Sequence, residues 1–307
     1  MSFFTKLLNK IKAETQSRQP EREEEHERAE AYDDSRGPAR RTSEFERVAR
    51  GSADWTRIPD ERPGTQTLNR SILLAQPEHD FGGFMLALRE QGLSESTEGG
   101  LHEGGIVLHH RGMTAVCAYN PSPIPDGEVE QNCKYNSLWP DAQAAVEGYA
   151  AQIEVSLRNV SDGLAGHKFL TGIVAALLTD TPNALAVYSA PMVVSRAAYL
   201  ASTEMLEEGL LPINLWVFVG LYDTPSGCCA YTHGMRDFGS DELELLNTQR
   251  PSGEAFEMMF SVAAYAIERN LVFQGGEEIA FKDEQSLTLT RSAGTALEGT
   301  TLKVEGF

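Results

Sequence analysis

Two polar loops carry the side chains of this chain that are best suited to chemistry, and each loop follows a predicted β-hairpin. In the second loop, His233 is followed by the carboxylates Asp237 and Glu242. A histidine beside a carboxylate can act as a general base, so these three residues are the candidates for acid–base catalysis. The candidate binding residues are Asn120, Asp126, Glu128, Asn132, Tyr135, Asn136, Trp139, Tyr231 and Thr232. If the loops are related by a pseudo-two-fold axis, both can line one cleft.

The same loops also have a purely structural interpretation. Asn and Asp favour turns, and the prolines within 121–127 fix φ and end a sheet. Ser240 is of a type that caps a helix, with the charges of Asp241 and Glu242 near the helix N-terminus. Catalysis needs convergent geometry, which a sequence does not display, so the structural interpretation is the simpler one.

Metal and cofactor sites are not expected. The histidines weighed as ligands are His102, His109, His110, His167 and His233. None has the H-x-x-x-H or H-E-x-x-H spacing that places two ligands on one helical face. The chain also has no G-x-S-x-G, Walker A or G-x-G-x-x-G motif. The sequence therefore indicates no nucleophile elbow and no nucleotide-phosphate loop.

The charge is strongly acidic and unevenly distributed. The formal net charge is −19; residues 1–65 carry 13 Lys and Arg against 14 Asp and Glu, and the remainder carries 13 against 31. A body with this balance repels phosphate, which disfavours nucleic-acid binding and favours a basic protein partner or simple solubility.

Cysteine usage and hydropathy indicate a cytoplasmic protein. The four cysteines, Cys117, Cys133, Cys228 and Cys229, have no C-x-x-C spacing and are expected to be reduced and buried. No apolar run reaches the length of about 18 residues that a membrane span needs, and no secretory signal is recognisable.

The first 65 residues are expected to differ from the rest. Residues 1–12 place Phe3, Phe4, Leu7, Leu8 and Ile11 at helical spacing and also contain three lysines, Lys6, Lys10 and Lys12, which predicts a short basic amphipathic helix. Such a helix could dock on its own domain, on a partner, or weakly on the inner face of a membrane. Residues 13–65 are charged and poor in aliphatic side chains, which predicts a disordered linker.

Residues 66–307 are expected to form one α+β domain from two tandem pseudo-duplicated βαββαβ (ferredoxin-like) units, about 66–160 and 183–307. The first unit has strand 71–75, helix 81–91, a loop over 92–105, a hairpin over 106–119, helix 142–149 and strand 152–158. After a linking helix over 167–178, the second unit has strand 185–188, helix 195–208, a hairpin over 214–233, a loop over 236–242, helix 253–270 and strands 286–290 and 301–304. These elements are predicted from apolar periodicity and turn residues.

Several motifs in this region resemble a bacterial family known as domain of unknown function 4261. They are Pro121-Ser-Pro-Ile-Pro-Asp-Gly-Glu128, Asn132-Cys-Lys-Tyr-Asn136, Trp216-Val-Phe-Val-Gly-Leu-Tyr222, Tyr231-Thr-His-Gly234 and Phe238-Gly-Ser-Asp-Glu-Leu-Glu244. The resemblance covers roughly residues 70–307 and implies no activity.

Two functions are compatible with the sequence. The first is a non-enzymatic binding module, such as an immunity or adaptor protein of a toxin or secretion system, which captures a basic protein. The alternative is a hydrolase or transferase that uses the loop cleft, with His233 as general base.

Overall fold

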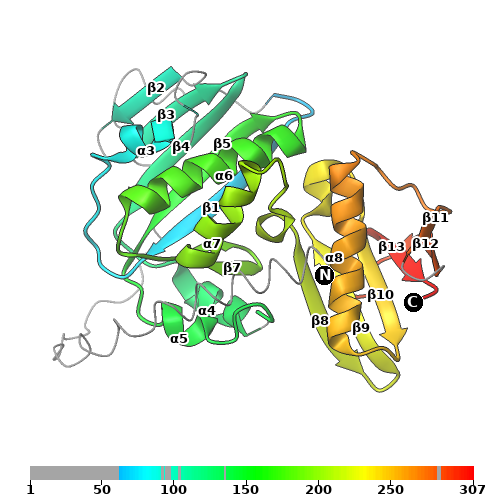
Figure 1. The fold of residues 1–307 in the computed structure, drawn as a ribbon. Helices are drawn as coiled ribbons and strands as arrows, with labels where there is room; N and C mark the ends of the chain where they lie inside the picture. Colours follow the sequence, from blue (N-terminus) through cyan, green and yellow to red (C-terminus); the bar gives the residue numbers. More distant parts are fainter. Residues whose placement is uncertain (1–61, 91–92, 94–97, 103–104, 135, 282–284) are drawn as a thin grey trace.

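The computed structural model describes residues 62–90, 93, 98–102, 105–134, 136–281 and 285–307. The predicted helix over 1–12, most of the predicted linker over 13–65 and the candidate Tyr135 lie outside the described residues. The part that is described contains both helices and sheets, which confirms the α+β class (Figure 1).

The first sheet has seven strands in the order β2-β3-β4-β5-β1-β6-β7, and every neighbouring pair is antiparallel. Its strands are β1 (Gln66–Leu74), β2 (Glu98–His102), β3 (Gly105–His110), β4 (Met113–Asn120), β5 (Ala151–Val160), β6 (Ala184–Ser189) and β7 (Met192–Ser195). The central strand β1 has apolar side chains on both faces, and Ile72 and Leu73 are both fully buried. A strand of this kind needs cover on two sides.

Helices supply that cover. One face is packed by α3 (Phe84–Glu90), α6 (Gly163–Asp180) and α7 (Arg196–Thr203), and the β6–β7 end of the other by α4 (Glu128–Cys133) and α5 (Ala142–Val146). The long helix α6 begins at a cap in which Asp162 Oδ1 accepts from Ala165 N at 3.1 Å. Leu73 belongs to the α4/α5 side of the sheet, whereas Ile72 belongs to the α6 side.

The second sheet has six strands in the order β11-β12-β13-β10-β9-β8, with one parallel pair, β10 and β13. Its strands are β8 (Phe218–Thr224), β9 (Gly227–His233), β10 (Glu242–Thr248), β11 (Glu278–Ala280), β12 (Ser286–Ala293) and β13 (Thr300–Glu305). Helix α8 (Ser252–Glu268) packs across β8, β9 and β10 (Figure 1).

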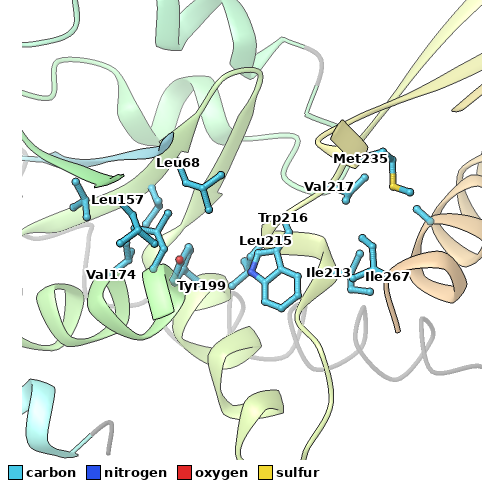
Figure 2. Packing of buried hydrophobic residues seen from close by; sticks show 14 of the residues in the cluster. Leu68, Leu157, Val174, Tyr199, Ile213, Leu215, Trp216, Val217, Met235 and Ile267 are labelled. Atoms are coloured by element: carbon cyan, nitrogen blue, oxygen red, sulfur yellow. The ribbon is translucent and has the colours of Figure 1, made fainter. Parts of the chain in front are cut away.

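A continuous core joins the two sheets. The connection runs through the 3₁₀ turns η4 (Glu204–Leu206) and η5 (Ile213–Leu215). Around η5, Ile213, Leu215, Trp216 and Val217 are buried and lie between the α6 side and the α8 side (Figure 2). Trp216 Nε1 donates to Thr171 Oγ1 of α6 at 2.9 Å, so the only polar atom of this indole side chain is satisfied inside the core.

The tandem duplication is not confirmed. The strand and helix expected to open the second unit, β6 and α7, belong to the first sheet, where β6 pairs with β1 from Ser71↔Tyr188 to Leu74↔Ala184. The physical reason is that β1 is buried on both faces. Its backbone N–H and C=O groups therefore need a hydrogen-bonded strand along each edge, and β5 and β6 supply these. The second sheet therefore begins at β8, without the strand and helix that would make it a repeat of the first unit.

Two local predictions were wrong. Residues 98–102, expected in a loop, form the edge strand β2 on β3. Ser240 caps no helix, because residues 242–248 form the central strand β10, which was not predicted. In β10 the acidic side chains of Glu242 and Glu244 are buried. Charged residues are typical of exposed loops, so the sequence pattern of this strand favoured a polar loop.

Candidate functional site

The most apolar cavity lies where the two sheets meet; we call it the junction pocket. It has a volume of about 460 Å³ and lies between the 136–141 loop, β7, β8 and α8. Its apolar walls include Leu138, Trp139, Val193, Val217, Phe256 and Phe260. Asp141 is the one charged residue among its described lining residues. A cavity of this size and lining suits apolar side chains or a small ligand.

The loop over the junction pocket is held by Asn136, a predicted binding residue. Asn136 Oδ1 accepts from Trp139 N at 3.1 Å, and Asn136 Nδ2 donates to Val193 O of β7 at 2.6 Å. This turn fixes the loop on the edge strand and sets Trp139, also a predicted binding residue, against the α4/α5 core. Leu138 at the tip remains 39% exposed.

A second cavity, the polar pocket, has a volume of about 340 Å³ and shares Met192 and Phe218 with the junction pocket. The three catalytic candidates His233, Asp237 and Glu242 all line it. The two candidate loops thus line two neighbouring pockets, whereas the sequence led us to expect one cleft.

Glu242 is buried and its carboxylate is fully used by the protein. It accepts from Thr232 Oγ1 at 2.8 Å and from the backbone N–H groups of Gly234, Met235 and Arg236 at 2.9, 3.2 and 3.4 Å. These bonds fold the turn that carries η6 (Met235–Phe238). Thr232, a predicted binding residue, is fully buried and also accepts from Leu243 N at 2.8 Å. In this arrangement Glu242 shapes the loop.

Asp237 pairs with His167 and not with His233, the partner expected from the sequence. His167 Nε2 lies 2.9 Å from Asp237 Oδ2, and His167 Nδ1 lies 3.5 Å from a nitrogen of Arg70. An arginine can only donate, so Nδ1 must accept and Nε2–H must donate to the carboxylate. Burial lowers the pKa of His167, and the hydrogen bond to Asp237 opposes this shift. The imidazole is therefore neutral, as its contact with Arg70 requires.

This Arg70–His167–Asp237 network ties β1, α6 and η6 together. Arg70 also donates to Ser189 Oγ at 2.8 Å and to Leu215 O at 3.4 Å, and the His167 ring stacks on Phe238 at 4.9 Å between centroids. His167 is only 1% exposed, so it cannot reach a ligand. Arg70 is the one charged residue of the central strand β1, and this was the available sequence signal for the network.

His233 is exposed, and among the described residues no hydrogen bond joins it to Asp237 or Glu242. The acid–base pairing expected from the sequence is therefore absent from these contacts. Tyr231, a predicted binding residue, packs instead in an aromatic row, with its ring centroid 6.2 Å from Phe218 and 6.3 Å from Tyr222.

The remaining candidates of the first loop lie away from both pockets. Asn120 Nδ2 donates to Glu154 Oε1 at 3.0 Å, and Asp126 occupies a left-handed turn position with φ of 63°. Asn132 Nδ2 and Glu128 Oε1 meet the hydroxyl of Tyr188, at 2.9 and 2.6 Å. Asn132 and Glu128 thereby fasten α4, which follows the turn η3 (Pro125–Gly127), to β6.

A metal centre is not evident: no group of three His, Cys, Asp or Glu among the described residues is placed to hold an ion. The helices of the described part are likewise too short or too polar to cross a membrane.

A comparison with known proteins gives a match in the C-terminal part of the chain. Residues 231–305 match the family model of a domain of unknown function, DUF4261. The family resemblance expected from the sequence is thus confirmed over these residues, which include the end of β9, all of β10 and α8, and the C-terminal strands. None of the curated proteins and none of the solved structures compared with the chain matches it.

Proposed function

We propose that this protein is a non-enzymatic cytoplasmic binding protein that holds an apolar segment of a basic partner in the junction pocket. The observation that carries the proposal is the pocket itself, an apolar cavity of about 460 Å³ between the edge strands of two sheets. Apolar cavities with few polar groups are the usual form of a ligand or anchor site. Partner anchors of this kind supply much of the affinity of an interface.

The sign of the charge argues for a basic partner. Residues 66–307 carry 13 basic and 31 acidic side chains, and Asp141 stands at the pocket. A cationic segment would be attracted over a distance of about 8 Å at physiological salt, and its apolar side chains would then fill the pocket. Binding should therefore weaken as salt is raised.

Affinity capture with full-length tagged protein tests the proposal. Leu138→Glu places a charge at the rim of the junction pocket; Leu210→Glu is a matched control, because Leu210 is 38% exposed against 39% for Leu138 and lies elsewhere. The wild-type and Leu210→Glu proteins should retain a basic protein at low salt, and Leu138→Glu should lose it. Equal retention by both variants, or no partner at low salt, would contradict the proposal.

A second candidate is a hydrolase or transferase that uses the polar pocket. The observation in its favour is that the exposed His233 shares this pocket with Asp237 and Arg236. His233 would be the general base and would need a substrate to bring it into contact with a proton donor. A His233→Ala variant that keeps its stability but loses a turnover detected in the wild type would establish this function.

A further inference from the structure

We infer that residues 1–12 of the same chain are an intramolecular occupant of the junction pocket and compete there with the partner. The regulatory part of this inference rests on the proposed function, whereas the docking itself does not. The argument uses the chemistry of the pocket, the sequence of the segment and the length of chain between them.

The chemistry of the segment matches the pocket. Residues 1–13 contain no Asp or Glu, and they place five large apolar side chains at helical spacing, with Lys6 and Lys10 between them and Lys12 directly after the last. The pocket offers an apolar lining in which Asp141 is the single charged residue within the described part of the chain. An apolar stripe flanked by lysines can therefore bury its side chains in the cavity while its ammonium groups remain near acidic surface.

A larger cavity among the described residues is a poorer match. It has a volume of about 740 Å³ and lies beside α6, and charges of both signs line it, including Arg111, Lys168, Asp162 and Glu207. Lysines of the segment would meet two cations there, and its apolar side chains would desolvate five charged groups, Glu90 being the fifth.

The tether makes the intramolecular event favourable. Residues 13–61 separate the segment from the first described residue, Arg62, and an extended chain of this length spans roughly 160 Å. A body of the described size has a radius of gyration of about 18 Å, so every part of its surface is within reach. Tethering raises the local concentration of the segment to about the millimolar range, which lets even a weak contact be populated.

Disulfide cross-linking in the full-length chain tests this inference. The four native cysteines are buried and should react slowly, so the introduced cysteines can be cross-linked selectively. The test pair is Leu8→Cys with Leu138→Cys. One control is Asn9→Cys with Leu138→Cys, because at about 100° per residue position 9 lies opposite the apolar stripe. The other is Leu8→Cys with Leu210→Cys, which probes the larger cavity.

Under mild oxidation the test pair should form an intramolecular cross-link at least about fivefold faster than either control, at a rate that does not change on dilution. Equal rates for all three pairs would overturn the inference, as would a faster reaction at position 210. An absent cross-link together with flotation of the chain on anionic vesicles, lost on deletion of 1–12, would identify the segment as a membrane contact instead. If the cross-link forms but Leu138→Glu still captures the partner, the docking stands and the proposed partner site is wrong.

Discussion

Replacing Glu242 tests whether its carboxylate folds the loop or takes part in chemistry. Its two oxygens hold the Thr232 hydroxyl and the backbone N–H groups of Gly234, Met235 and Arg236. Because the side chain is 4% exposed, water cannot replace these bonds without a change in the loop. We therefore expect a large loss of stability on its removal.

The magnitude follows from the number of donors that lose an acceptor. Each buried donor left unsatisfied costs about 1–3 kcal/mol. Glu242→Ala strands the close donors of Thr232, Gly234 and Met235, so the free energy of unfolding should fall by about 3–5 kcal/mol. Glu242→Gln keeps one carbonyl oxygen for Gly234, and its amide can donate to the Thr232 hydroxyl. Met235 N–H and the Thr232 O–H, which both donate to Glu242 Oε2 in the native protein, then lose their acceptor, so the expected loss is about 2–4 kcal/mol, smaller than for Glu242→Ala.

Urea unfolding of the full-length variants measures this order. The control is Glu254→Gln, because Glu254 forms an exposed pair with Arg250 at 3.4 Å and its loss should change stability by less than about 0.5 kcal/mol. If Glu242→Ala unfolds at the same urea concentration as the control, the carboxylate does not hold the loop. It would then be available for acid–base chemistry in the polar pocket.

Three further outcomes are expected. Burial lowers the pKa of His167 in the folded state, so below its ordinary value of 6.5 the unfolded chain binds a proton that the folded chain does not. The free energy of unfolding should therefore fall as the pH is lowered below this value, by at most about 1.4 kcal/mol per pH unit. The free energy of unfolding of His167→Gln should depend less steeply on pH. All four cysteines are buried, and burial raises the pKa of Cys117 to about 12; a thiol reagent at neutral pH should thus label the native protein slowly and the denatured protein at four sites. Gly163→Ala should destabilise by about 1–3 kcal/mol, because its Cβ would meet the Asp237 carbonyl oxygen. Gly253→Ala, which has open space in another helix, should be neutral or stabilising in thermal unfolding; similar melting temperatures would refute the steric argument.

Sequence periodicity predicted most elements, because their apolar residues repeat with the period of the structure they form. Helices α6 and α8 and both hairpins were expected close to where they lie. The pairing of the strands was not predictable in the same way. The sequence of β6 looks like the beginning of a new unit, yet β6 pairs with β1 in the first sheet. This pairing follows from the need of β1 for a hydrogen-bonded neighbour on each edge, which is a property of the folded sheet and not of the local sequence.

The candidate site shows a similar division. Sequence identified the residue types around both pockets, and Asn136, Trp139 and His233 do line them. The sequence suggested His233, four residues away, as the partner of Asp237, whereas the partner is His167, which is separated from it by 70 residues in the chain. A partner this remote is set by the packing of α6 against η6, which local spacing does not encode.

The placement of the two pockets follows from the topology. The chain leaves the first sheet at its last strand, β7, and enters the second at its outermost strand, β8, and among the described residues no backbone hydrogen bond joins these two edges. Side chains alone bridge the gap, and Met192 and Phe218 divide it into two cavities. The polarity of each cavity then depends on what closes it. Phe256 and Phe260 of α8 close the junction pocket, whereas Arg70 and Asp237 close the other. A binding surface placed between two sheets in this way can vary through its loops and α8 without a change in either sheet, because no strand pairing crosses it.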